Sequence, residues 1–204
     1  MGYKFLKYIL ILVVLGLLIF GLLNFTYFTK QARFHLGKVF ITEVQRQEIR
    51  KENPIKYEPN QLVIESLDIV APIQFVTESN ETAYQAALVN GVVLFPGTAE
   101  VGQVGNTYIF GHSSDFAFSK GNFKTVFALL PQIEIGTLVD VSDKEGTKYT
   151  YKVYDKFVAE KNRTDLLNQE TNGKAVLTLQ TSYPIGTALK RYIVKAKLVE
   201  DSDK

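Results

Sequence analysis

Three polar residues stand at the ends of strand-like runs and have side chains that could perform chemistry together. His112 closes "TYIFGH", Ser182 closes "AVLTLQTS" and Arg191 opens "RYIVKAKL". An imidazole can take up or donate a proton, and a hydroxyl can attack a substrate when a base activates it. A guanidinium beside them would supply a fixed positive charge. The three residues are therefore the first candidates for a site.

The alternation of side chains along a strand gives Ser182 and Arg191 a common orientation. Ser182 shares its face with Gln180, and Arg191 shares its face with Lys195, in each case away from the more apolar side of the run. If the two strands pair, the hydroxyl and the guanidinium meet over one open surface. Alternation does not place His112, because its strand is apolar on both faces.

Each of these residues also has an ordinary structural explanation. A serine at a strand end commonly serves a turn, and an arginine at the start of a strand is commonly a solvated charge. A histidine after a glycine is commonly a hydrogen-bonded surface residue. The types and spacing of these three residues alone therefore leave their function open.

The composition excludes several classes of protein. The 23 basic and 21 acidic residues give a formal charge of +2, which does not favour a nucleic-acid partner. The absence of cysteine excludes disulfides, Cys-ligated zinc and a thiol nucleophile in the chain as printed. With only His35 and His112, a multi-histidine metal site is not expected either.

The N-terminal segment predicts an uncleaved, single-pass membrane anchor. No residue from Tyr8 to Thr29 is charged, and as a helix this run would be roughly 33 Å long, enough to cross a bilayer core. No small-residue cleavage site of a signal peptide follows it. Two lysines precede the run and three basic residues follow it closely, so charge alone does not favour an external C-terminus.

Residues 30–52 have the pattern of a helical stalk that ends before Asn53-Pro54. Its apolar stripe consists of Leu36, Val39, Phe40 and Val44. The simplest interpretation is a spacer above the membrane. The alternative, in which the stripe covers a groove of the following domain, stays open. We therefore divide the chain into an anchor at 1–29, a stalk and linker at 30–59 and a folded domain at 60–204.

The folded domain is predicted to be mainly β. Short runs rich in Val, Ile, Tyr and Thr alternate with turn residues, and "SDKEG" between Val141 and Thr147 predicts a hairpin turn. Only "TAYQAAL" and "NFKTVFALL" have a helical pattern in this part. A single antiparallel barrel or sandwich fits these runs best.

Two long motifs resemble those of the sortases, which are membrane-anchored cysteine transpeptidases of mainly Gram-positive bacteria. The segment "ALVNGVVLFPGTAEVGQVGNTYIFGHSS" resembles their histidine block, with matches at Pro96, Gly97, Thr98, Ala99, Gly105, Asn106, Gly111 and His112. The segment "LTLQTSYPIGTALKRYIVKAKL" resembles their TLxTC block and arginine strand, with matches at Thr178, Leu179, Thr181 and Arg191. The similarity extends over roughly residues 60–199, in order.

The resemblance implies a closed eight-stranded β-barrel and a transpeptidase on the outer face of the cell membrane. Such enzymes cleave an LPXTG-like sorting signal of partner proteins and join the acyl group to an amine, from lipid II or a pilin lysine. His112 would protonate the leaving amine and Arg191 would hold the developing oxyanion. The catalytic residues implied are His112, Arg191 and the residue at position 182.

Position 182 departs from the family, because Ser182 stands where sortases have their nucleophilic cysteine. A hydroxyl needs a positioned general base, and no acidic residue is in an obvious position to orient His112; Asp115 is the nearest in sequence. We therefore expect an inactive or very weak enzyme that still binds its peptide. The serine marks either a natural degenerate member or a deliberate replacement of cysteine. A non-catalytic pseudo-sortase that binds sorting signals is the alternative function.

No cofactor or metal is predicted. Calcium is bound by part of the sortase family, and Glu78, Glu81 and Glu100 lie in expected loops. Scattered acidic residues are usually solvated, so these three do not predict a calcium site.

Overall fold

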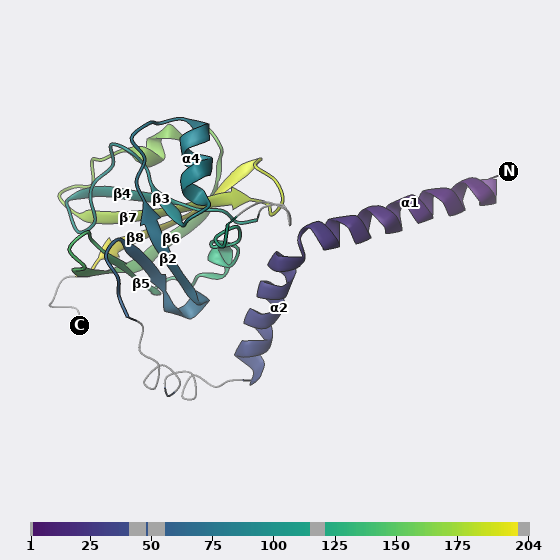
Figure 1. The fold of residues 1–204 in the computed structure, drawn as a ribbon, viewed down its shortest axis with the longest axis horizontal. Coiled ribbons are helices and arrows are strands. Elements are labelled where there is room, and N and C mark those ends of the chain that lie inside the picture. Colours follow the sequence, from purple (N-terminus) through teal and green to yellow (C-terminus); the bar gives the residue numbers. More distant parts are fainter. Residues whose placement is uncertain (1, 41–47, 49–55, 115–120, 200–204) are drawn as a thin grey trace.

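The computed structural model describes residues 2–40, 48, 56–114 and 121–199, and eight of its strands form a closed barrel (Figure 1). The order around the barrel is β1-β2-β3-β4-β7-β8-β6-β5. In chain order the strands are β1 Gln61–Ile64, β2 Ile69–Gln74, β3 Val92–Leu94, β4 Gly105–Phe110, β5 Leu138–Ser142, β6 Lys148–Glu160, β7 Ala175–Tyr183 and β8 Lys190–Leu198. The closed eight-stranded barrel expected from the resemblance is thus confirmed.

Two pairings in this barrel are parallel, so the expectation of a purely antiparallel sheet is wrong. β2 pairs in parallel with β3, and β4 pairs in parallel with β7, whereas the other neighbours are antiparallel. Parallel neighbours need a long crossover between them. The short helix α4, Glu81–Leu88, lies in the β2–β3 connection, and the β5–β6 hairpin lies in the β4–β7 connection.

The core fills the inside of the barrel with aliphatic side chains. Five aliphatic residues on four strands are fully shielded from solvent there: Leu62, Ile109, Leu177, Leu179 and Val194. A second, smaller cluster lies around Tyr108, Ala159, Leu166 and Ile193, where the β6–β7 connection with its 3-10 helix η3, Thr164–Leu167, joins the strands. Strands packed in this way give the residues at their ends fixed positions.

The β5–β6 hairpin forms at "SDKEG", as the sequence predicts. Asp143 Oδ1 accepts hydrogen bonds from the backbone N–H groups of Glu145 (3.0 Å) and Thr147 (2.8 Å), which is a side-chain turn of the kind Asp favours. Gly146 has φ +84°, a value that glycine adopts without strain. After the turn, Tyr151 is buried and Lys152 is exposed, which confirms the predicted alternation of β6.

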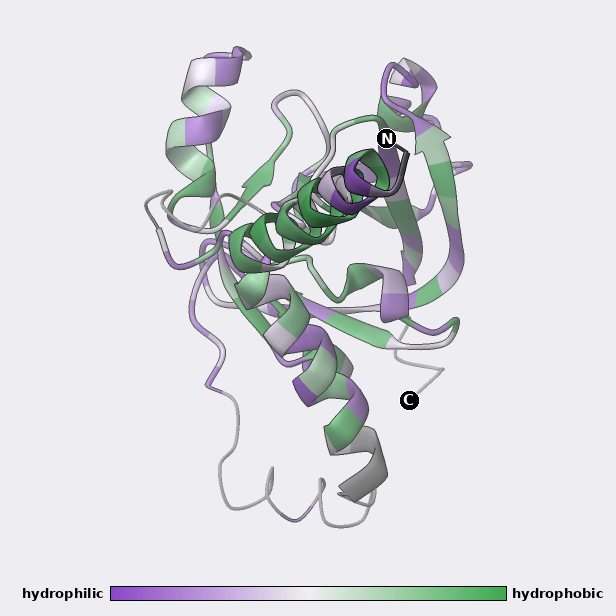
Figure 2. Cartoon of the chain, turned by 90° about the vertical axis from the view of Figure 1, so that its right-hand side faces the viewer, coloured by the Kyte–Doolittle hydropathy of each residue, from purple (hydrophilic) through white to green (hydrophobic). Residues whose placement is uncertain are grey.

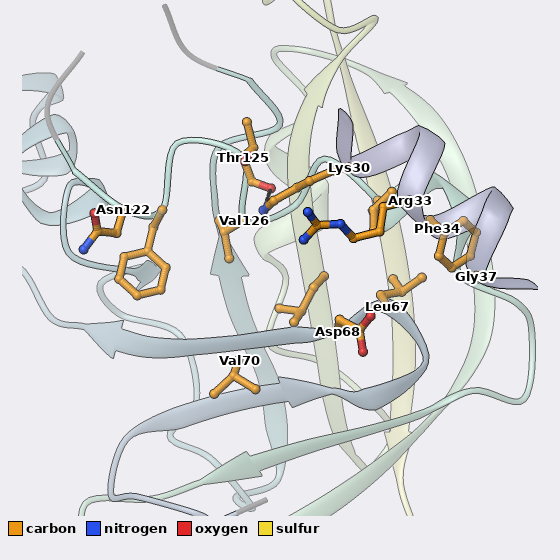
Figure 3. A pocket seen from close by; sticks show the side chains of 13 residues that line it. Lys30, Arg33, Phe34, Gly37, Leu67, Asp68, Val70, Asn122, Thr125 and Val126 are labelled. Atoms are coloured by element: carbon orange, nitrogen blue, oxygen red, sulfur yellow. Dashed lines mark hydrogen bonds between the residues drawn. The ribbon is translucent and has the colours of Figure 1, made fainter. Parts of the chain in front are cut away.

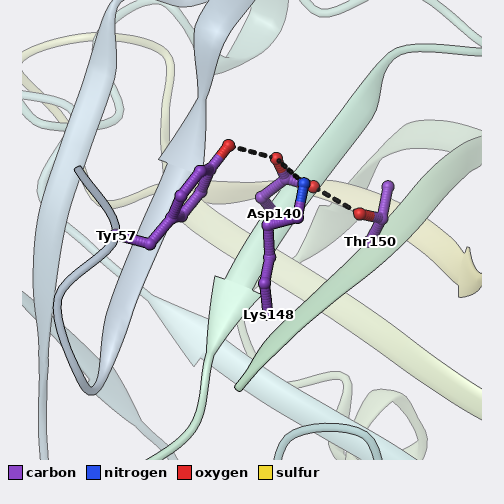
Figure 4. Close-up of polar contacts among 4 residues, drawn as sticks. All are labelled: Tyr57, Asp140, Lys148 and Thr150. Carbon is purple, nitrogen blue, oxygen red and sulfur yellow. Dashed lines mark hydrogen bonds and ion pairs between the residues drawn. The ribbon is translucent and has the colours of Figure 1, made fainter. Parts of the chain in front are cut away.

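A polar cluster around Asp140 connects the segment before β1, which carries Tyr57, with the β5–β6 hairpin (Figure 4). Tyr57 Oη donates to Asp140 Oδ2 (2.5 Å), and Thr150 Oγ1 donates to Asp140 Oδ1 (2.6 Å). Lys148 Nζ lies 3.4 Å from the same carboxylate. Burial, with the added hydrogen bond to Asp140, raises the pKa of the Tyr57 hydroxyl.

The second stretch with a helical pattern, residues 122–130, does not form an α-helix. It forms successive turns, in which Ala128 N–H donates to Thr125 O (3.1 Å), and it leads into the 3-10 helix η2, Leu130–Gln132. β-Branched and aromatic residues here favour helix only weakly, and Pro131 follows directly. Their burial on the barrel prevails over the helical pattern.

Two helices precede the barrel. α1, Gly2–Leu23, carries Lys4 and Lys7 near its N-terminus, has no charged residue after them, and extends away from the barrel (Figures 1 and 2). It is long and apolar enough to cross a membrane, which is consistent with the predicted anchor. The uncharged run Tyr8–Thr29 divides at Asn24, so its last five residues begin α2, Phe25–Phe40. The chain division at residues 29 and 59 stays a prediction.

α2 packs against the barrel through the side that carries Lys30, Gln31 and Phe34, and Figure 3 shows Lys30 and Phe34 on this side. Lys30 Nζ donates to Thr125 O (2.9 Å), and Gln31 Nε2 donates to Ala128 O (3.2 Å). Burial lowers the pKa of Lys30.

The predicted apolar stripe of the stalk does not make this contact in the part that can be described. Leu36 is 55% exposed. The Val39 and Phe40 side chains, Val44 and the stop at Asn53-Pro54 lie outside the described residues. The helix therefore contacts the domain, but through residues on a different side from Leu36.

Candidate active site

Ser182 and Arg191 face each other across two paired strands. β7 and β8 are antiparallel, and their register places Ser182 directly opposite Arg191. Residues in such positions have Cβ atoms about 4.5–5.5 Å apart on the same face of the sheet. Both side chains are partly exposed. The juxtaposition that side-chain alternation predicts for this pair is therefore present.

His112 reaches the same place by way of β4. The parallel register of β4 and β7 ends with Phe110 opposite Gln180, and Gly111 N–H donates to Gln180 O (3.1 Å). His112 lies two residues after Phe110, and Ser182 lies two residues after Gln180. Ser182 therefore lies between His112, at the end of β4, and Arg191, at the start of β8.

Short-range contacts hold the His112 backbone. Thr181 Oγ1 donates to Gly111 O (2.8 Å), and Phe127 N–H donates to His112 O (2.9 Å). A Cβ on Gly111 would lie 2.8 Å from the Phe127 ring, so glycine is needed there for close packing. The residue before His112 is thus tied both to β7 and to the β4–β5 connection.

His112, Ser182 and Arg191 line one pocket of about 280 Å³, and none of them is sealed inside the barrel. An aromatic group from α4 and β4 forms another wall, with the Tyr84 and Phe110 rings 5.2 Å apart. An open pocket with an apolar wall and a few converging polar groups is the usual form of a binding site.

Arg191 is held by backbone carbonyls of the β7–β8 loop and of the first residue of β8. Its Nη1 donates to Ala188 O (3.1 Å) and to Lys190 O (3.0 Å). A guanidinium has five N–H donors in a fixed plane, so these bonds orient it while further donors stay available for an oxyanion. Gly186 N–H donates to Ser114 Oγ (3.0 Å), which ties the same loop to the segment after His112.

A second pocket, of about 380 Å³, also adjoins Ser182. It is lined by Phe20, Leu23 and Asn24 at the end of α1 and by Gly186 in the β7–β8 loop. Ser182 lines both pockets. The end of the apolar helix α1 therefore lies close to the candidate nucleophile, a relation that the sequence does not predict.

Tyr108 and Gln180 belong to the site but were not predicted as site residues. Tyr108 Oη donates to Gln180 Oε1 (2.7 Å), and Gln180 lines the pocket with Arg191. Burial raises the pKa of Tyr108, and the charge of Arg191 lowers it in part. The signal in the sequence was the alternation of β7, which puts Gln180 on the same face as Ser182.

The expectations about metal ligands and Asp115 stay predictions. Among the described residues, no three His, Asp or Glu side chains gather as ligands for a metal ion. Glu78 accepts a hydrogen bond from Asn80 Nδ2 (2.8 Å), and Glu81 accepts one from Gln85 Nε2 (2.7 Å). Asp115 lies outside the described residues.

The fold is that of a sortase-type transpeptidase domain. A profile of the sortase domain family matches residues 62–199, and the chain belongs to this family. No curated protein sequence matches the chain. The family membership covers the strands that carry all three candidate residues.

Solved structures of several sortases have the same fold. The sortase D5 transpeptidase of Clostridium perfringens is 23% identical, with a TM-score of 0.56 over 83% of this chain and 93% of that one. Sortase C-1 of Actinomyces oris is 22% identical, with a TM-score of 0.57 over 86% and 98%. Sortase C of Streptococcus pneumoniae is 18% identical, with a TM-score of 0.58 over 72% and 68%.

Proposed function

We propose that this protein is a membrane-anchored sortase whose reaction is acyl transfer from an LPXTG-like sorting signal to an amine. The observation that carries the proposal is the position of residue 182, directly opposite Arg191 and in one pocket with His112. Family membership supports the class of reaction. The domain would face the outside of the cell, with α1 as its anchor.

The steps follow from the chemistry of a cysteine at position 182. Its thiolate attacks the Thr carbonyl carbon of the signal, and Arg191 stabilises the oxyanion by charge-assisted hydrogen bonds. His112 gives a proton to the departing glycine nitrogen as the C–N bond breaks and the thioester forms. The acceptor amine, from lipid II or a pilin lysine, then attacks the thioester, forms the new amide and releases the thiol.

Ser182 weakens the first step. A hydroxyl is almost wholly protonated at neutral pH and needs a base that is itself oriented by a third group. Arg191 supplies a positive charge and cannot act as this base. In a well-studied protease, removal of the triad nucleophile lowers kcat on the order of a million-fold. We therefore expect the chain as printed to bind sorting signals and to cleave them at a negligible rate.

The test is the variant Ser182→Cys in the full chain, in detergent or nanodiscs, with a panel of LPXTG-like peptides. We expect cleavage between Thr and Gly, with a thioester-linked acyl-enzyme visible by mass spectrometry, only in the cysteine variant. The matched control is Ser182→Cys with His112→Ala, in which cleavage should fall sharply. If Ser182→Cys neither cleaves nor forms an adduct with any peptide, the catalytic proposal is wrong.

The second candidate is a pseudo-sortase that binds sorting signals without cleaving them, and Ser182 itself favours it. Ser182 is close in size to cysteine, so the pocket keeps its shape. Titration of the same peptides against both forms separates the two functions. Binding in both forms without cleavage in either supports the pseudo-sortase.

A further inference from the structure

Gln180 is a polar side chain that lines the pocket and that the reaction itself does not use. It lies two residues before Ser182 on the same face of β7 and lines the pocket together with His112 and Arg191. Its side-chain oxygen accepts the hydrogen bond from Tyr108 Oη (2.7 Å). Tyr108 is 3% exposed, so this bond holds the amide in one orientation.

An amide oriented in this way has its donor side available. The Nε2 group carries two N–H donors, and neither has an acceptor among the described residues. Gln180 is itself only partly buried. A group that donates into an open pocket is suited to accept a carbonyl oxygen from a ligand.

The spacing of Gln180 and Ser182 matches that of an extended peptide. Along a strand, side chains two residues apart on one face are about 6.6 Å apart, and carbonyls two residues apart in an extended peptide point to the same side at the same interval. A peptide that runs along β7 with its scissile carbonyl at Ser182 therefore presents a second carbonyl to Gln180.

We propose that Gln180, oriented by Tyr108, binds the backbone carbonyl of the substrate two residues before the scissile carbonyl. This inference rests on the proposed function, in which that group is the Pro carbonyl of an LPXTG-like signal. Gln180 is then a binding residue that sets the register of the peptide, and Tyr108 is a positioning residue that acts through it. The contact recognises an extended backbone and is independent of the side chain at the third position of the signal.

The test uses the full chain with Ser182 in nanodiscs, because the absence of turnover makes the measured Kd a binding constant. Three peptides are compared by calorimetry: the unmodified signal, one with a thioamide at the Pro carbonyl, and one with a thioamide at the following residue. We expect Gln180→Leu to raise the Kd of the unmodified peptide about 3- to 10-fold, as for the loss of one hydrogen bond. Tyr108→Phe should raise it less.

The peptide and protein changes together form a cycle that a merely structural role would not reproduce. The Pro thioamide, a poor acceptor, should weaken binding to the unsubstituted chain but not to Gln180→Leu. The thioamide at the following residue points to the other side of the peptide. It should change the Kd by the same factor for the unsubstituted chain and for Gln180→Leu. Tyr108→Phe should have no further effect on Kd in a Gln180→Leu background. Gln103→Leu and Tyr154→Phe, which lie outside this pocket, serve as matched controls.

Equal effects of the Pro thioamide on the unsubstituted chain and on Gln180→Leu overturn this inference. So does a Gln180→Leu variant that lowers the unfolding midpoint and weakens all three peptides alike. If Ser182→Cys cleaves the signal, but the effects of Gln180→Leu and the Pro thioamide on Kd are independent of each other, only this inference fails. If no peptide binds or is cleaved in any form, the proposed function fails with it.

Discussion

Thr181 donates a hydrogen bond of 2.8 Å from its side chain to the carbonyl oxygen of Gly111. Each of these residues directly precedes a candidate catalytic residue, Ser182 on one side and His112 on the other. Thr181 is 2% exposed, so the bond is shielded from water. It joins the end of β7 to the segment that follows β4. It therefore helps to fix the distance between the Ser182 hydroxyl and the His112 imidazole.

Replacement of Thr181 by valine should loosen this coupling. Valine keeps the shape but leaves the buried Gly111 carbonyl without this donor, at a cost of about 1–3 kcal/mol in the free energy of unfolding. In the Ser182→Cys background the cleavage rate should fall as well. Urea unfolding and peptide cleavage measure the two effects. Thr181→Ser keeps a hydroxyl and should recover most of both; a serine variant as impaired as valine would contradict the explanation.

Arg191 should act on the rate of acyl transfer more than on peptide affinity. In the Ser182→Cys background, Arg191→Ala removes an oxyanion donor, and the expected fall in kcat is about 10²- to 10³-fold. Arg191→Lys should not restore it, because an ammonium cannot reproduce the planar array of donors held by the β7–β8 loop. Lys195→Ala is the control, since Lys195 shares the face of Arg191 but lines another pocket. An Arg191→Ala enzyme with unchanged kcat would exclude the oxyanion role.

Phe34 should determine how firmly α2 is held on the barrel. Its ring packs against the core cluster, next to the bonds from Lys30 and Gln31 to the turn that follows β4. Phe34→Ala should weaken the contact by about 1–2 kcal/mol, which corresponds to roughly 5- to 30-fold faster hydrogen exchange at the amides of 125–128. Leu36→Ala, on an exposed part of the same helix, should leave exchange unchanged. Equal effects of the two substitutions would contradict the observed docking side.

Tyr57 should contribute to a loss of stability at high pH. Its pKa is raised in the folded protein by burial and by the hydrogen bond to Asp140. Because the folded state holds this proton more tightly than the unfolded chain, its contribution is complete below about pH 10 and is lost as the pH rises through the folded pKa.

The corresponding measurement is the urea midpoint of unfolding between neutral pH and pH 11. Tyr57→Phe should lower the midpoint at neutral pH, by the loss of a charge-assisted hydrogen bond of about 1.5–3 kcal/mol, and should flatten the decline above about pH 10. Tyr84→Phe is the control, because phenylalanine keeps the ring contact with Phe110 and the Tyr84 hydroxyl has no hydrogen-bond partner among the described residues. A Tyr57→Phe variant with the original slope would show that other tyrosines account for the decline.

Local patterns in the sequence were sufficient for several features of this protein. The uncharged N-terminal run, the "SDKEG" turn and the alternation of β6 depend on neighbouring residues, and the structure contains each of them. The common orientation of Ser182 and Arg191 was also predictable, since side-chain direction in a strand follows from odd and even positions alone. The family motifs added the closed barrel.

Only the tertiary structure decided the relations between distant segments. The place of His112 depends on the parallel register of β4 and β7, which no local pattern encodes because both faces of β4 are apolar. The side of α2 that contacts the barrel and the bond between Tyr108 and Gln180 depend in the same way on which surfaces meet. Residues 122–130 show the converse, since burial against the barrel prevailed over a helical pattern. The sequence alone determined which residues could take part in the chemistry, and the packing of the strands determined which of them meet.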